Sequence, residues 1–285
     1  MTDRLKIFLL LSPAMIVVGV LFFGGLAVGV LRSFSYMPVA GLTEPNLDAY
    51  RAILSSGTFR QSFLLTFHIA LTSTLISAVI AVAAALLLRR SFSGRGTAIF
   101  FFQLNLTVPH IVGALGILYL FSQSGSFARL AYAAGMIEAP AGFPALIFDP
   151  YAIGIILHYV WKEVPFIGVV VLAQMRTVGE DYESVARSLG ASRWQAFRHV
   201  LLPLVFPGLL SASAIVFAFT FGAYEIPALL GASHPQALPV LAYRSYTDAD
   251  LATRPQAMAM AVVIALLSGA MIWLYLRVTR AAVRS

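Results

Sequence analysis

Six apolar runs dominate this sequence, and each is long enough to cross a bilayer as a helix. A spanning helix needs about 20 predominantly apolar residues. Inside a bilayer the backbone polar groups must bond to one another, so such runs are helical. The sequence therefore predicts an all-α, polytopic membrane protein with six transmembrane helices, at residues 7–31, 62–88, 98–122, 151–173, 204–224 and 256–278.

The composition supports a membrane protein. Of the 285 residues, 60% are hydrophobic and 11% are charged, and the mean hydropathy is +0.87. A water-soluble fold of this length needs more polar surface than this. The first run is longer than the apolar region of about 7–15 residues in a cleaved signal peptide. We therefore expect it to be retained as the first helix.

The basic residues predict the orientation. With both termini on one side, 12 of the 19 Lys and Arg residues lie on that side, six lie on the other, and Lys162 lies within a span. Cytoplasmic loops carry the excess of Lys and Arg in membrane proteins. We therefore expect a multi-pass protein of the plasma (inner) membrane with both termini in the cytoplasm.

Several classes of site are excluded by the sequence. There is no cysteine, which excludes disulfides and thiolate metal sites. Neither lysine, Lys6 or Lys162, follows a glycine, which excludes a G-x-x-x-x-G-K-[ST] phosphate loop. No G-x-S-x-G with a partner histidine and no H-E-x-x-H occurs. We therefore expect no catalytic residue, no metal site and no cofactor bound by this chain, and any ATP that powers the protein would be bound by another chain.

Residues 174–203 form the longest polar, charge-bearing insertion between the apolar runs. Two pairs in it match the capping box at a helix start: Thr177 with Glu180, and Ser192 with Gln195. Gly190 stands where a left-handed helix end favours a residue without Cβ. The pattern predicts two short helices that are separated at Gly190, the first over residues 177–190.

The first of these helices has a narrow apolar stripe. Tyr182, Val185, Ala186 and Leu189 recur at helical spacing. Such a stripe on a polar insertion predicts docking onto another protein; an ordinary amphipathic loop between spans is the alternative. The predicted docking residues are Tyr182, Glu183, Ser184, Val185, Ala186, Leu189, Gly190 and Ala191.

The string E-S-V-A-R-S-L-G-A-S at residues 183–192, followed by L-P at residues 202–203, resembles a known motif. It is similar to the cytoplasmic EAA loop of the permease subunits of binding-protein-dependent ABC importers, which have the type I, MetI-like fold. In that family the first short helix is the coupling helix, which docks on an ATPase. Ser184 replaces the glutamate usually found six residues before the glycine, which leaves open whether Glu183 takes its place.

This resemblance implies a transporter subunit and not an enzyme, and it also implies partners and a division of the chain. The partners would be two ATP-binding ATPase subunits carrying ATP and Mg, a second permease subunit (the same or homologous), a periplasmic or lipid-anchored solute-binding protein and the lipid bilayer, with no nucleic acid. Residues 1–61 would be a peripheral transmembrane helix with an outer segment. Residues 62–285 would be the five-helix permease core, with the coupling loop at residues 174–203.

The segment from Phe221 to Gly231, with L-P-V at residues 238–240 and R-P-Q-A-M at residues 254–258, resembles the polyamine, ferric-iron and thiamine branch of these permeases. The resemblance implies a small polar or cationic solute such as a polyamine. A sugar or ferric-iron ABC permease remains an alternative. A single-chain secondary transporter is the alternative of a different class.

Polar residues within or beside the spans are candidates for the solute pathway. A charge at the centre of a spanning helix costs about 2.5–3.5 kcal/mol, so Lys162 and Glu163 should face a water-filled path or be paired inside the bundle. We favour a structural or gating role for them over solute recognition. Pro109 is expected to kink the third span. The pathway candidates are Asn105, His110, Trp161, Lys162, Glu163, Tyr224 and Glu225.

Overall fold

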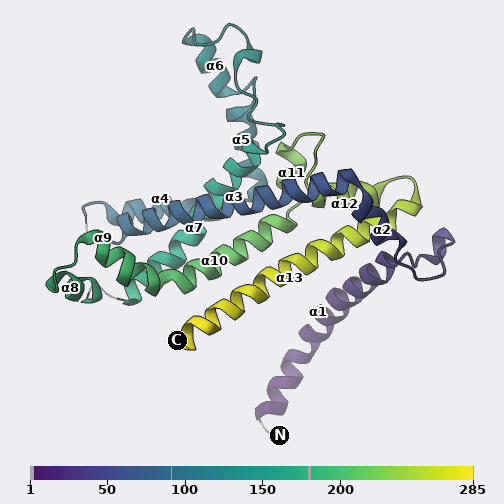
Figure 1. Cartoon of the computed structure of the whole chain (residues 1–285), viewed down its shortest axis with the longest axis horizontal. Helices are drawn as coiled ribbons and strands as arrows, with labels where there is room; N and C mark the ends of the chain where they lie inside the picture. Colours follow the sequence, from purple (N-terminus) through teal and green to yellow (C-terminus); the bar gives the residue numbers. More distant parts are fainter. Residues whose placement is uncertain (1–2, 91, 179–180, 285) are drawn as a thin grey trace. The chain divides into compact units, whose positions relative to one another are not determined.

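The computed structural model describes residues 3–90, 92–178 and 181–284, and within them the regular structure is helical (Figure 1). In these ranges strand pairing is limited to an isolated bridge between Met37 and Leu42. The longer helices are α1 (Asp3–Ser33), α3 (Gly57–Leu88), α4 (Arg95–Thr107), α5 (His110–Phe121), α7 (Ile153–Val178), α10 (Leu202–Gly222) and α13 (Arg254–Arg284). The shorter ones are α2 (Asp48–Ser55), α6 (Ser126–Ala133), α8 (Asp181–Ser188), α9 (Arg193–Ala196), α11 (Glu225–Leu230) and α12 (Leu238–Thr247).

Within the described residues, six helical stretches are long and apolar enough to cross a membrane. They are Leu5–Ser33, Gly57–Leu88, His110–Ala133, Ile153–Thr177, Arg193–Gly222 and Leu251–Tyr275. The predicted fold class and the predicted number of spans are therefore confirmed.

The third predicted span is two helices and not one kinked helix. Helix α4 ends at Thr107, Val108 is extended (φ −74°, ψ 125°), and α5 begins after Pro109. Proline lacks the N–H that would continue the helix, and it disfavours helical backbone in the residue before it. The predicted kink at Pro109 is therefore wrong: the helix ends before Pro109, and a new helix begins after it.

The residues divide into two compact units. The first unit comprises residues 1–60 and 238–266, and the second comprises residues 61–237 and 267–285. In the first unit, the hydroxyls of Ser33 and Tyr50 share a 2.8 Å hydrogen bond that joins the end of α1 to α2. The predicted division at residues 61 and 62 stays a prediction.

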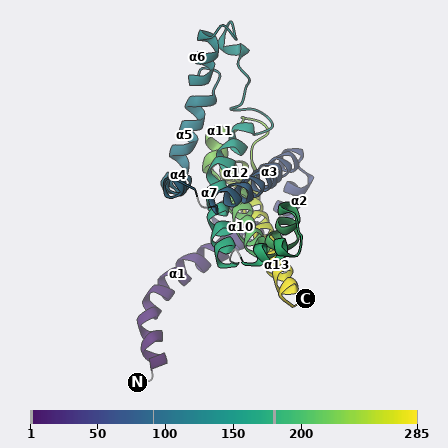
Figure 2. The ribbon, with the colours of Figure 1, turned by 90° about the vertical axis from the view of Figure 1, so that its left-hand side faces the viewer.

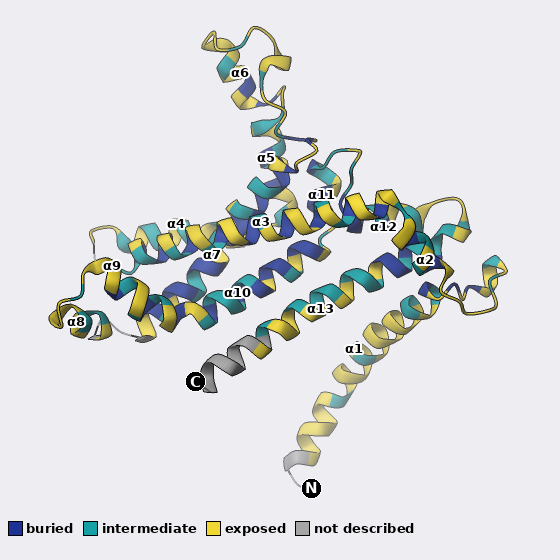
Figure 3. Ribbon diagram, in the orientation of Figure 1, coloured by how far each residue is buried: buried dark blue, intermediate teal, exposed yellow. Residues whose placement is uncertain are grey.

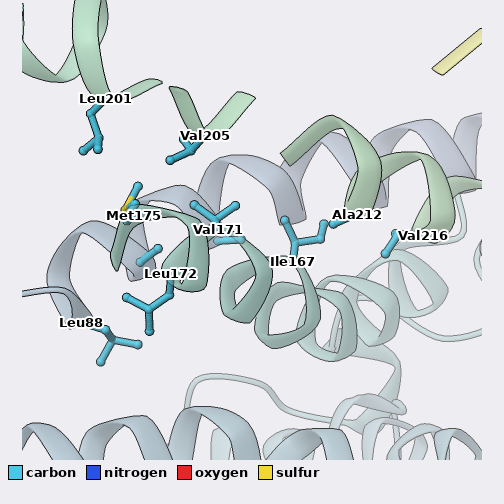
Figure 4. Packing of buried hydrophobic residues seen from close by; sticks show 11 residues of the cluster. Leu88, Ile167, Val171, Leu172, Met175, Leu201, Val205, Ala212 and Val216 are labelled. Carbon is cyan, nitrogen blue, oxygen red and sulfur yellow. The ribbon is translucent and has the colours of Figure 1, made fainter. Parts of the chain in front are cut away.

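Helix α7 is the centre of the second unit. It packs against α4, α5 and α10, and its apolar residues meet those of α10 in one cluster (Figure 4). Close packing of side chains holds spanning helices together, because lipid removes most of the hydrophobic driving force between them. The cluster includes Ile167, Val171, Leu172 and Met175 of α7, and Val205, Ala212 and Val216 of α10.

Small residues let α3 join this packing. Ser73, Ser77, Ala81 and Ala85 recur every four residues in α3, and all four are fully buried. Ala81 and Ala85 belong to the same cluster as the apolar residues of α7. In contrast, α6 continues the course of α5 away from α7 and α10 in two views at right angles (Figures 1 and 2). The second unit therefore has a packed part around α7, where the candidate residues described below gather.

Candidate functional site

Helix α8 ends in a complete Schellman motif. Gly190 has φ +92°, its N–H donates to Arg187 O (3.0 Å), and the Ala191 N–H donates to Ala186 O (3.0 Å). These two bonds satisfy carbonyls that the end of a helix leaves free, and the left-handed residue favours glycine. A Cβ placed at Gly190 would have no neighbour within 4 Å. The requirement for glycine is therefore conformational and not steric, as the sequence predicts.

The next helix is capped as predicted, whereas the start of α8 is not. The Gln195 N–H donates to Ser192 Oγ (3.2 Å), and the Ser192 N–H donates to Gln195 Oε1 (2.8 Å), which is the capping box. Thr177, however, lies within α7, and its hydroxyl donates to Ala173 O (3.1 Å). Glu180 lies outside the described residues. The predicted cap at Thr177 is therefore wrong, and α8 is shorter than the predicted helix.

The apolar stripe of α8 is exposed (Figure 3). Tyr182 and Val185 are each 59% exposed, and Leu189 is 84% exposed. Ala186 is half-buried on the same stripe. Burying a large apolar side chain gains about 1.5–3 kcal/mol, so these three residues together can supply on the order of 5 kcal/mol to a partner that covers them.

Glu183 forms a contact within the chain. Its carboxylate forms an ion pair with the Arg89 guanidinium, which follows the end of α3. The two side chains are only 26% and 16% exposed, respectively. This pair fixes α8 to the end of α3 across 94 positions of sequence. Ser184, beside it, is exposed.

Lys162 of α7 reaches the break between α4 and α5. Its Nζ donates to Asn105 O (2.6 Å) and to Val108 O. Asn105 O is the carbonyl that residue 109 would bond in an unbroken helix, and Pro109 has no N–H to offer. The lysine therefore adds a donor to the Asn105 carbonyl, which also accepts the Val108 N–H (3.2 Å), and binds the Val108 carbonyl at the end of α4. Asn105 adds a second link, because its side-chain amide donates to Trp161 O (2.5 Å).

Glu163 faces other elements. Its carboxyl accepts hydrogen bonds from Thr220 of α10 (2.6 Å) and Ser77 of α3 (3.4 Å). The residue is 4% exposed. The two adjacent charged residues thus hold three neighbouring helices to α7: Lys162 holds the end of α4, and Glu163 holds α3 and α10. Both side chains are hydrogen-bonded inside the bundle and both also line a cavity, so the choice between the two predicted arrangements stays a prediction.

A cavity of about 290 Å³ opens beside these residues, and Lys162, Glu163 and His110 line it together with apolar residues such as Phe166 and Phe219. His110 is the first residue of α5, and its ring lies 5.2 Å from that of Phe219. The cavity is small for a ligand pocket.

Behind His110 lies a buried aromatic group. The ring of His158 is 5.8 Å from that of His110, and 6.1 Å from that of Trp161. His158 is fully buried, and neither of its ring nitrogens has a hydrogen-bond partner in the described residues. Gly113 of α5 allows this packing, since a Cβ there would lie 2.5 Å from the Trp161 ring.

The last two pathway candidates lie apart from this group along the chain. Tyr224 precedes α11, and Glu225 is its first residue; both are exposed. Helix α11 packs against α5 and α7, which places these residues in the same unit as the cavity. Asp248 and Asp250 belong to the other unit, where their carboxylates accept local backbone N–H groups (both 2.9 Å).

Three contributors to the site were not among the predicted residues. Thr220 and Ser77 bind Glu163, and Arg89 binds Glu183. Ser77 has a signal in the sequence, because it belongs to the four-residue repeat of small side chains in α3. Thr220 and Arg89 have none, since each meets its partner only through the fold.

Comparison with known proteins identifies relatives. Residues 73–284 match the sequence model of a family described as binding-protein-dependent transport system inner membrane component. The molybdenum transport system permease protein ModB of Mycobacterium tuberculosis is 29% identical over 228 residues, which cover 77% of this chain and 81% of that protein. The probable sulfate transport system permease protein cysT of Marchantia polymorpha is 28% identical over 171 residues, 60% of this chain and 56% of that protein.

A similar fold occurs in a crystal structure of a bacterial ABC transporter involved in the import of the acidic polysaccharide alginate. A chain of that structure superposes with a TM-score of 0.80 at 18% sequence identity. The superposition covers 97% of this chain and 95% of that one. At this identity the match shows a shared fold.

Proposed function

The chain belongs to the family of binding-protein-dependent transport system inner membrane components, and on this premise we propose that α8 couples a solute path around α7 to a separate ATPase. As a member of this family the chain is a permease subunit of an ABC importer, a multi-pass inner-membrane transport component and not an enzyme. The finer assignment concerns the coupling helix, the partners and the solute.

The observation that carries the proposal is the exposed stripe of α8. Tyr182, Val185 and Leu189 are mostly exposed although they are apolar. The Schellman motif at Gly190 and the ion pair of Glu183 with Arg89 hold this helix in a defined position. A rigid helix with an uncovered apolar stripe is suited to transmit a push from a protein partner.

The partners we propose are two ATPase subunits carrying ATP and Mg, a second permease subunit and a solute-binding protein. ATP-driven closure of the ATPase pair and docking of the loaded binding protein would bias a helix bundle with two arrangements. The break at Pro109 places a hinge-like interruption beside the small cavity, and Lys162 bridges it. Helix α8 packs against the segment Phe197–Leu201, which leads into α10, and α10 packs against α7. Movement of α8 can therefore reach this point through the packed core.

For the solute, we propose a small charged molecule. The cavity of about 290 Å³ carries both a lysine and a glutamate. A polyamine remains the prediction from the sequence. A tetrahedral oxyanion is the second candidate, because ModB and cysT are named as molybdenum and sulfate permeases and because Lys162 and His110 both line the cavity.

Two variants test the coupling. Gly190→Val places a β-branched residue at φ +92°, where left-handed backbone costs an L-residue about 1–2 kcal/mol or more. Ala186→Asp places a charge on the stripe. We expect both to abolish ATP-driven uptake and to reduce copurification of the ATPase with the tagged chain, while the amount of chain in the membrane stays the same.

The matched controls are Gly94→Val and Ser188→Asp. Gly94 has φ +84° and an equally open Cβ position, but it lies in the loop before α4. Ser188 is exposed near the same end of α8 but outside the stripe. Both controls should keep the ATPase bound. Unchanged copurification and uptake in Gly190→Val and Ala186→Asp would contradict the proposed coupling.

The solute is tested on the binding protein that accompanies this permease. Its melting temperature is measured against polyamines, tetrahedral oxyanions and sugars. A higher melting temperature with a polyamine or with an oxyanion supports a small charged solute, and it shows whether the charge of that solute is positive or negative. A rise with a sugar alone contradicts the proposed class while leaving the coupling mechanism intact.

A further inference from the structure

A second cavity, of about 490 Å³, lies beside the coupling helix. Four arginines line it: Arg89 and Arg90 after α3, Arg187 of α8 and Arg193 of α9. Trp194 and Phe197 add an aromatic wall, with their rings 5.4 Å apart. All of these residues belong to the second unit.

The charge in this cavity is unbalanced. Among the residues that the structure describes, Glu183 is the one acidic residue in the lining, and it is paired with Arg89. Among the described side chains, Arg90, Arg187 and Arg193 have no acidic partner. Counted over this described lining, four guanidinium groups against one carboxylate leave a formal surplus of three positive charges. Guanidinium groups bind phosphate with paired, charge-assisted hydrogen bonds.

The cavity also lies at the end of a membrane span. The candidate span Gly57–Leu88 ends one residue before Arg89. Basic pockets between spanning helices at a membrane surface bind the headgroups of anionic lipids. Apolar side chains, including Leu86 and Leu201, complete the lining. A molecule with a phosphate and an apolar remainder matches both kinds of lining.

We propose that this cavity binds a phosphate group, and specifically the phosphodiester headgroup of an anionic phospholipid. The headgroup would lie between the end of α3 and the α8–α9 segment, with its phosphate on the arginines and its glycerol against Trp194. A bound headgroup would neutralise the surplus charge and fasten the coupling helix to the membrane surface. A free phosphate ion shares this chemistry, and the experiment below separates the two sources. The inference does not depend on which solute the permease carries.

The test is lipid retention by the purified full-length chain, measured by native mass spectrometry in a neutral detergent. The chain is loaded from vesicles of phosphatidylglycerol and phosphatidylcholine and then delipidated. The cavity variant is Arg90→Gln/Arg193→Gln. The matched control is Arg176→Gln/Arg198→Gln, which removes two exposed arginines of neighbouring segments that do not line the cavity.

We expect the wild type and the control to retain phosphatidylglycerol over phosphatidylcholine. The cavity variant should retain about thirtyfold less, since each basic residue near an anionic surface contributes about a factor of five. If the double variant does not fold, the single variant Arg90→Gln at an exposed position should show about a fivefold loss. Equal loss in the cavity and control variants would overturn the proposal.

Two further arms decide the source and the class of partner. Displacement of the retained lipid by inorganic phosphate, in the wild type but not in the cavity variant, supports the phosphate site and makes free phosphate a second ligand. Unchanged lipid retention by the cavity variant, together with loss of copurifying ATPase, overturns the proposal and assigns the arginines to the ATPase.

Discussion

Replacing Lys162 with methionine separates a structural role of this lysine from a role in binding solute. Methionine has a similar length and no charge, so it fills the same volume without donating a hydrogen bond. The substitution removes the two bonds from Nζ to the carbonyls of Asn105 and Val108. If the lysine holds the α4–α5 break together, the variant should be less stable before any solute is added.

The expected loss of stability depends on which hydrogen bonds each of the two carbonyls keeps in the variant. Asn105 O keeps the Val108 N–H (3.2 Å). Val108 O loses its lysine, and the Val112 and Gly113 amides nearby both donate to Pro109 O. An unsatisfied buried carbonyl costs about 1–3 kcal/mol, and a lost bond from a charged donor costs about 1.5–3 kcal/mol. The variant no longer has to bury a charged ammonium group, which offsets part of these costs. We therefore expect the free energy of unfolding to fall by about 3 kcal/mol.

The assay is the temperature at which the detergent-solubilised chain loses its monodisperse peak in size-exclusion chromatography. A loss of about 3 kcal/mol corresponds to a fall on the order of 5–10 °C for a protein of this size. Lys162→Arg keeps N–H donors at this position and should recover part of the fall. If Lys162→Met is as stable as the wild type but takes up less solute, the lysine acts on the solute and the structural interpretation is wrong.

Two other contacts lead to predictions of the same kind. The single variants Arg89→Glu and Glu183→Arg should each weaken copurification of the ATPase, because two like charges would push α8 away from the end of α3. The double variant restores an ion pair and should restore copurification. An equal loss in the double variant would contradict a positioning role for the ion pair. Gly113→Ala should lower the melting temperature, because its Cβ would lie 2.5 Å from the Trp161 ring and overpacking costs about 1–3 kcal/mol. Gly116→Ala in the same helix meets nothing within 4 Å and should leave the melting temperature unchanged; a similar fall in both would show that the α5–α7 contact is not the cause.

The sequence predicts those parts of this protein that depend on neighbouring residues. The six spans follow from runs of apolar residues, and comparison with relatives confirms the permease family. The Gly190 stop and the Ser192–Gln195 capping box are also local, since every bond in them joins residues within five positions. The orientation of the termini and the roles of the individual site residues stay predictions.

The errors come from motifs with two possible structures. A threonine hydroxyl can cap a helix start or bond back to a carbonyl within a helix, and Thr177 does the second because α7 continues to Val178. A proline can kink a helix or end it. At Pro109 the helix ends, and Lys162, 53 positions away, donates to the carbonyls of Asn105 and Val108 at this end. Neither choice is decided by the residues nearby.

The position of α8 is the central claim, and the absence of cysteine allows a direct measurement. Leu189→Cys introduces one thiol at a residue that is 84% exposed, to which a membrane-impermeant maleimide carrying a photo-crosslinker is attached. We predict labelling in inverted membrane vesicles but not in intact spheroplasts, and a photo-adduct with the ATPase. Val39→Cys, at a residue that is 89% exposed and predicted to lie outside, should show the opposite labelling and no adduct. Labelling of Leu189→Cys from the outer side, or no adduct with a copurifying ATPase, would contradict the account.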